Sequence, residues 1–147
     1  WQEKLIPSGN LVLATTAEVK ANFGNYGSDF YFYHAPTIGG NNGLRGFRNE
    51  RFAGNTYFYQ SSDLKARLAR IVTAAAPITI GAYGGFDYGR VWVDDNLVLD
   101  PSYNANGWNT SAGGGVFINA VDMMTFNIST FHSDDGLRLA FKLGFGF

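Results

Sequence analysis

The last eleven residues of the chain alternate strictly between large apolar side chains and small or polar ones. A period of two places all the apolar side chains on one face of a β-strand, whereas a helix would scatter them around its circumference. The chain therefore ends in a strand with one apolar face. The apolar positions are Leu137, Leu139, Phe141, Leu143, Phe145 and Phe147.

The same alternation recurs upstream and predicts an all-β protein. Most of the predicted segments reach the roughly 9–11 residues that a tilted strand needs to cross a bilayer. One segment, residues 61–76, also fits an amphipathic helix, but the aromatic run before it, residues 57–59, favours a continuous strand. The seven predicted strands cover residues 10–23, 30–38, 56–71, 78–93, 107–121, 123–132 and 137–147.

Composition excludes several classes of function. The formal net charge is -1, which offers no electrostatic basis for binding nucleic acid. The chain has no cysteine, and its two histidines, His34 and His132, are far apart, so neither disulfides nor a thiolate metal site can form. Serine, histidine and aspartate all occur, but no activated nucleophile with its base can be placed. We expect neither an enzyme nor a cofactor.

The connections between predicted strands indicate a membrane barrel. Short turns at residues 25–29, 72–77 and 121–122 alternate with long polar connections at 39–55 and 94–106, and outer-membrane barrels have this asymmetry. The less apolar face consists mainly of Gly, Ser, Thr and Asn, with too few Lys and Glu for a soluble exterior. We therefore expect the apolar face to meet lipid. A soluble carrier of lipocalin type, with its apolar face inward, is the alternative.

Two sequence blocks resemble the BamA-type barrels of the outer-membrane protein eighty-five superfamily, also called bacterial surface antigens. The first is IGGNNGLRGFRNERF, residues 38–52, whose Leu44-Arg45-Gly46-Phe47 resembles the sixth-loop signature. The second is GGFDYGRVW, residues 84–92, which resembles the neighbouring strand motif through Phe86, Gly89 and Trp92. The resemblance implies that residues 1–147 form the C-terminal seven or eight strands of a transmembrane β-barrel of about 16 strands.

The resemblance also implies a clamp between the first block and the barrel wall. In the family the loop folds back into the lumen, so Arg45 would be its tip, next to Gly46 and Phe47, and Asp87 its main partner. Asp63 would supply a second carboxylate. The parity of the strand supports Asp87, because the neighbouring Phe86 and Tyr88 belong to the apolar face and Asp87 therefore points inward.

The expected function follows from the same resemblance. Such barrels insert or translocate other proteins at the bacterial outer membrane, and the terminal strand, with Phe141, Phe145 and Phe147, would form one side of a weak seam. The expected partners are outer-membrane lipid, client outer-membrane or secreted proteins, and the remaining strands of the same barrel, with periplasmic domains absent from this sequence. A small stand-alone or dimeric pore or binding protein is the alternative.

Overall fold

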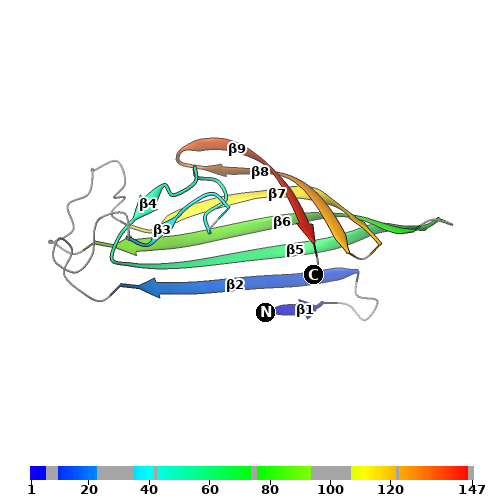
Figure 1. Ribbon diagram of the computed structural model, residues 1–147, viewed down its shortest axis with the longest axis horizontal. Helices are drawn as coiled ribbons and strands as arrows, with labels where there is room; N and C mark the ends of the chain where they lie inside the picture. Colours follow the sequence, from blue (N-terminus) through cyan, green and yellow to red (C-terminus); the bar gives the residue numbers. More distant parts are fainter. Residues whose placement is uncertain are drawn as a thin grey trace.

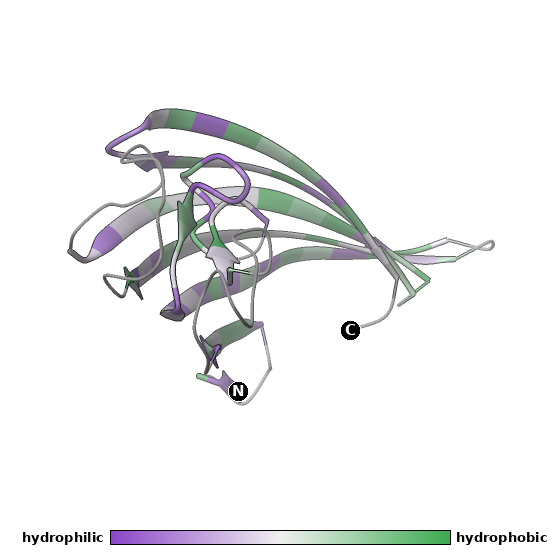
Figure 2. Ribbon diagram, turned by 60° about the vertical axis from the view of Figure 1, so that its left-hand side comes forward, coloured by the Kyte–Doolittle hydropathy of each residue, from purple (hydrophilic) through white to green (hydrophobic). Residues whose placement is uncertain are grey.

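The fold is a single curved antiparallel sheet with a loop packed on its concave side (Figures 1 and 2). The structure is a computed structural model that describes residues 1–5, 10–22, 35–41, 43–73, 76–93, 107–121 and 123–145. The described residues include no helix that is long and apolar enough to cross a bilayer. The strands of the sheet are, in spatial order, β1 (Gln2–Lys4), β2 (Leu11–Ala21), β5 (Thr56–Val72), β6 (Pro77–Trp92), β7 (Asn109–Ala120), β8 (Met124–Ser133) and β9 (Gly136–Phe145).

The strand predicted over residues 30–38 is wrong as a strand of the wall. β2 pairs directly with β5, from Leu11 opposite Ala66 to Ala21 opposite Thr56, so no other strand lies between them. The described end of the predicted segment forms β3 (Thr37–Ile38), which pairs with β4 (Phe52–Ala53) in a separate two-stranded sheet. Alternation could not reveal this, because Ile38 is buried in the loop rather than directed at lipid. Residues 23–34 lie outside the described part of the chain.

The ambiguous segment after residue 60 is a strand, and the helical alternative is wrong. β5 runs without a break from Thr56 to Val72 and pairs with β6 along its whole length. A β-bulge between Arg67 and Ala69 inserts one extra residue, which shifts the alternation of side chains between the two faces. Arg67 and Arg70 consequently lie on the same face, although they are an odd number of residues apart.

The apolar face of the sheet is its convex, exposed face, as the membrane interpretation expects. Leu139, Phe141 and Val116 keep 60%, 62% and 50% of their surface exposed, whereas the other face of the same strands carries small and polar residues covered in part by the loop (Figure 2). A soluble barrel would bury the apolar face. The predicted all-β, antiparallel fold is confirmed, and the sheet remains open between β9 and β1.

The two ends of the sheet differ in their connections (Figure 1). The chain between β2 and β5 and the chain between β6 and β7 are long and leave from one end, where the tight β8–β9 turn also lies. The short β5–β6 and β7–β8 connections lie at the opposite end. We call these the long-loop end and the short-turn end.

The cost of placing a charge on the exposed face should depend on how deep in the bilayer the residue lies, which gives a first prediction. We expect Val116→Arg, in the middle of β7, to lower the free energy of unfolding in lipid by about 2–4 kcal/mol, because a cation there must leave water. Thr110→Arg, on the same strand and face but close to the long-loop end, should cost only about 0–1 kcal/mol. Urea unfolding in phosphatidylcholine liposomes measures both, and equal losses would contradict lipid contact at this face.

Candidate functional site

The loop between β2 and β5 folds back onto the inner face of the sheet, where it has a small core of its own (Figures 1 and 2). β3 and β4 close the base of the loop. Gly40, with φ 65°, makes the turn that lets its amide donate to the carbonyl oxygen of Leu44 at 2.8 Å. The core residues are Ile38, Leu44, Phe47 and Phe52 from the loop and Tyr57 and Val91 from the wall.

The carboxylate of Asp87 anchors the tip of the loop. Its exposed fraction is 0%, and both of its oxygens are hydrogen-bonded. The backbone amide of Arg45 donates to Oδ2 at 2.9 Å. The hydroxyls of Ser61 on β5 and Ser111 on β7 donate at 2.8 and 2.9 Å. These serines flank Asp87 in the sheet register. Their hydrogen bonds therefore offset part of the free-energy cost of burying this charge.

The guanidinium of Arg45 completes the contact. Its Nε and Nη2 donate to Asp87, Nη2 at 2.6 Å from Oδ1, and Nη2 also lies 2.7 Å from Oδ1 of Asp63. The ring of Phe131 on β8 lies 4.1 Å from the Cζ of Arg45, a distance suited to a cation–π contact. Burial acts to lower the pKa of Arg45, but hydrogen bonds to Asp87 and Asp63 and the charges of both outweigh it and raise the pKa above its ordinary value.

Glycines make room for this contact at two places. A Cβ on Gly46 would lie 2.6 Å from the Cβ of Ser111 and 2.9 Å from that of Ser133, so the loop backbone touches the wall only because residue 46 has no side chain. A Cβ on Gly85 would lie 2.6 Å from Nη2 of Arg45. The second glycine thus leaves the space that the guanidinium fills.

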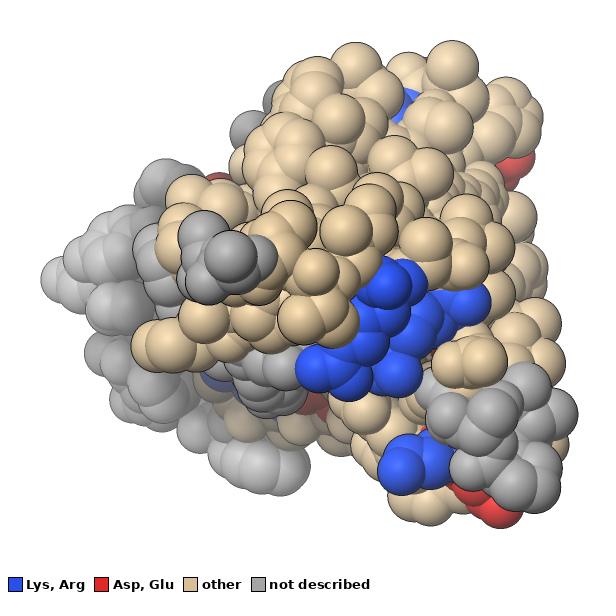
Figure 3. All heavy atoms as spheres, turned by 90° about the vertical axis from the view of Figure 1, so that its right-hand side faces the viewer, with Lys and Arg blue, Asp and Glu red and all other residues tan. Residues whose placement is uncertain are grey.

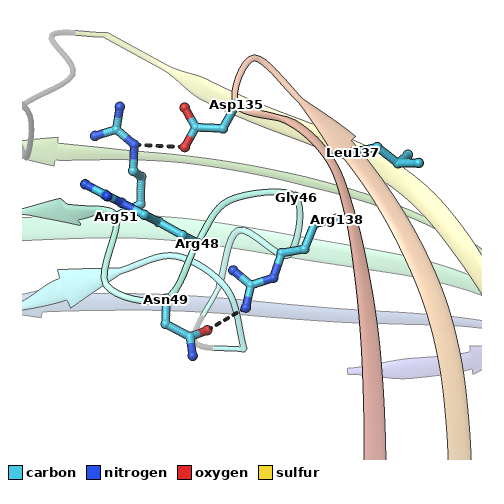
Figure 4. A pocket seen from close by; sticks show the side chains of 7 residues that line it. All are labelled: Gly46, Arg48, Asn49, Arg51, Asp135, Leu137 and Arg138. Atoms are coloured by element: carbon cyan, nitrogen blue, oxygen red, sulfur yellow. Dashed lines mark hydrogen bonds and ion pairs between the residues drawn. The ribbon is translucent and has the colours of Figure 1, made fainter.

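The terminal hairpin, β8–β9, holds the loop from the other side (Figure 4). Ser133 donates to the carbonyl oxygen of Gly46 at 2.8 Å. Arg138 on β9 donates through Nη1 to the carbonyl oxygen of Phe47 and through Nη2 to Oδ1 of Asn49 at 3.0 Å.

An ion pair and a cleft complete this side of the site. Nε of Arg51 lies 2.8 Å from Oδ2 of Asp135 in the β8–β9 turn, so the loop engages this carboxylate. Between loop and hairpin lies an open cleft of about 670 Å³, lined among others by Arg48 and Leu137.

Aromatic residues at the start of β5 divide between the two faces. Tyr57 and Tyr59 point inward and donate their hydroxyls to Glu18 of β2 at 2.5 and 3.1 Å, while Tyr57 also packs in the loop core. These two tyrosines therefore do not belong to an aromatic girdle on the lipid-facing side of the sheet. Phe58 points outward, where it contacts Trp108 at 6.0 Å between ring centroids.

The remaining motif residues lie in β6 and β9. Phe86 and Trp92 are exposed on the outer face, and Gly89 lies against β5, where a Cβ would be 2.9 Å from the Cβ of Tyr59. Phe141 is exposed on the outer face of β9. The backbone of Phe145 pairs with Met124, and Phe147 lies outside the described residues.

Charge is distributed unevenly along the inner face. Toward the long-loop end this face carries the carboxylates of Glu18, Asp63 and Asp87. Toward the short-turn end, Lys65, Arg67 and Arg70 follow one another on the inner side of β5, opposite Tyr83, Gly81 and Thr79. Figure 3 looks at this end and shows basic side chains gathered in one patch. Among the strand residues described on this half of the inner face, none is acidic, so the wall is basic there.

The structure thus brings together Arg45, Gly46, Phe47, Asp87 and Asp63, the loop-clamp residues identified from the sequence. The serines that bind Asp87, the Phe131 ring and the contact of Arg138 with the loop were not predicted from the sequence. The inward parity of these residues was readable, but their proximity to the loop depends on strand register. The arrangement positions a loop, and what it can do chemically is hold or release a segment.

The clamp generates a second prediction. Asp87→Asn keeps the shape of the side chain but removes its charge, and we expect a loss of about 3–5 kcal/mol in unfolding free energy, because Arg45 loses its main buried partner. Asp63→Asn, the matched control, should cost about 1–2 kcal/mol, since Asp63 makes one contact with the guanidinium. Chemical unfolding and hydrogen exchange of residues 44–47 measure both. Normal protection of these amides in Asp87→Asn would count against the clamp.

The close approach at Gly46 generates a third prediction. Gly46→Ala should push the loop off the wall and lower the unfolding free energy by about 1–3 kcal/mol, as overpacking does. Gly84→Ala is the control, because its Cβ would meet only the carbonyl oxygen of Gly113 at 3.9 Å, and its effect should stay within about 0.5 kcal/mol. Chemical unfolding and hydrogen exchange of residues 44–47 measure both variants. Equal losses of stability in Gly46→Ala and Gly84→Ala would mean that the close contact at Gly46 does not hold the loop to the wall.

Comparison with known proteins identifies a family for this chain. The family model of haemolysin secretion/activation proteins, ShlB/FhaC/HecB, matches residues 29–114. That range is more than half of the chain and contains the loop, β5, β6 and the clamp residues Arg45, Asp63 and Asp87. No curated protein and no solved structure matches significantly. The match supports the superfamily expected from the sequence, and not specifically its BamA-like branch. The chain belongs to the haemolysin secretion/activation family of ShlB, FhaC and HecB.

Proposed function

We propose that this chain forms the C-terminal wall of an outer-membrane barrel that secretes a client protein. The client class suggested by the family description is a haemolysin-type protein. The observation that carries the proposal is the infolded loop, whose Arg45 is held by the fully buried Asp87. Such a loop occupies the inner face along which a client would pass, so its position controls access to that face.

The open edges of the sheet support a role within a larger barrel. Among the strands that the structure describes, β9 pairs only with β8 and β1 only with β2, so each leaves a row of backbone groups without a partner in that part of the chain. In lipid, each backbone group without a hydrogen-bond partner raises the free energy by several kcal/mol. Further strands of the same barrel are the partner that removes this cost, and the seam would form where they meet β9.

The loop links the wall to the strand at this seam. Asp87 and Ser111 hold its tip from β6 and β7, while Ser133 and Arg138 hold it from the terminal hairpin. In our proposal, Arg138 couples the loop to β9, so that displacement of the loop by a client draws β9 with it and exposes its edge. That edge could pair with an extended client segment by β-augmentation, without nucleotide or cofactor.

Insertion of other outer-membrane proteins is the finer function suggested by the BamA resemblance. The same exposed edge would serve it, since a client strand could be templated there and released into lipid. Secretion has the further support of the family match. The two functions differ in the final location of the client, which is the medium for secretion and the outer membrane for insertion.

A secretion assay tests the proposal. In cells that make the full-length protein and a haemolysin-type client, we expect Arg138→Gln to reduce client in the medium by about tenfold, the change for a lost contact worth about 1.4 kcal/mol. Lys142→Gln is the matched control, because Lys142 lies on the same strand and face as Arg138, and should secrete normally.

The assay also distinguishes the alternatives. Folded outer-membrane proteins are counted in the same cells, and their loss with normal client export would favour insertion. Normal export by both Arg138→Gln and Arg45→Ala would refute the proposed role of the loop.

A further inference from the structure

Arg90 on β6 is an isolated charge on the outer face of the sheet. It lies opposite Phe58 and on the same face as Phe86 and Trp92, both of which are exposed. The other charged residues described in β2 and β5–β9 follow the inward parity of Glu18, Asp63, Asp87 and Arg138. A charge on an apolar, lipid-directed face is costly unless it has a partner.

Aromatic rings surround this arginine. Tyr88 and Trp92 lie two residues before and two residues after it on the same face of β6. The Cζ of Arg90 lies 5.5 Å from the centroid of the Trp92 ring. Phe58 of β5 and Trp108 of the chain just before β7 come within 6.0 Å of each other between ring centroids, although β6 lies between their strands. Trp108 also contacts Tyr88 at 5.7 Å and Trp92 at 6.3 Å. We call Phe58, Tyr88, Trp92 and Trp108 the aromatic cluster.

The guanidinium lacks an acceptor among the described residues. Its Nε is buried and has no hydrogen-bond partner in that part of the chain. The carboxylate on the same strand, Asp87, is directed inward and engaged by Arg45. The oxygen of Gln60, on the outer face, accepts the hydroxyl of Tyr88 at 2.6 Å. A buried N–H normally finds an acceptor, so the partner of Arg90 is expected from outside these strands.

The position of the cluster indicates which acceptor is available. Aromatic side chains gather where a barrel crosses the boundary between lipid and water, and this cluster lies near the long-loop end of β6, which ends at Trp92. Phosphate groups of lipids lie at that boundary. The planar fork of a guanidinium binds phosphate through two hydrogen bonds, and aromatic rings around it exclude water.

We infer that Arg90 and the aromatic cluster bind the phosphate group of a phosphorylated lipid in the leaflet at the long-loop end. In an outer membrane this leaflet contains glycolipid phosphates of lipid A type. The inference rests on the membrane setting of the proposed function, but not on secretion itself or on the loop clamp.

Lipid retention by the full-length protein tests the inference. Native mass spectrometry of detergent micelles with added bisphosphorylated lipid A should show saturable binding, and Arg90→Gln should weaken it by about tenfold, as loss of a charge-assisted contact predicts. Arg90→Lys should fall between them, because it keeps the charge and loses the fork. Arg67→Gln removes the same charge from the inner face and should bind as the unchanged protein does.

Two further arms identify the source of the phosphate. Lipid A with its phosphates removed should bind as weakly to the unchanged protein as intact lipid A binds to Arg90→Gln. Inorganic phosphate at matched concentration should not compete. Equal retention by Arg90→Gln and the unchanged protein, equal binding of the dephosphorylated lipid, or full competition by inorganic phosphate would each overturn the inference. None of these outcomes depends on the secretion assay, so the two proposals fail separately.

Discussion

The loop depends on one buried carboxylate. Asp87 is fully enclosed, and its charge is tolerable only because a guanidinium, a backbone amide and two hydroxyls converge on it. Two of these donors belong to the neighbouring strands, so the wall prepares the site and the loop completes it. Removal of Arg45 would leave a buried charge with weaker partners, and for this reason the loop and the wall behave as one unit.

The inner wall is built for contact rather than for solvation. Gly46 and Gly85 remove the side chains that would keep the loop and its guanidinium away from the strands. On the opposite side, Arg138 and Ser133 reach the loop from the terminal hairpin. The loop thus spans from the middle of the sheet to β9, which lies at one edge of the described sheet. A segment held at both places can transmit a change at one of them to the other.

Parity and resemblance together carried the prediction of the clamp, each supplying what the other lacked. Alternation around Phe86 and Tyr88 placed Asp87 inside, and the loop motif supplied Arg45 as its partner. Ser61, Ser111 and Arg138 are also inward by parity, but their roles depend on register between strands and on the path of a loop far away in sequence. The segment at residues 30–38 shows that alternation alone can mislead. Ile38 alternates as a residue of a wall strand would, yet it packs in the loop core.

The sequence by itself determined that the chain forms long strands with one apolar face, since a period of two fixes side-chain direction without reference to any partner. It also determined that this face carries little charge, with Arg90 as the exception in β2 and β5–β9. Only the tertiary structure decided that β2 pairs with β5, that the apolar face is convex, and that the terminal hairpin grips the loop. These features arise from contacts between residues distant in sequence, whose registers and distances no local pattern encodes.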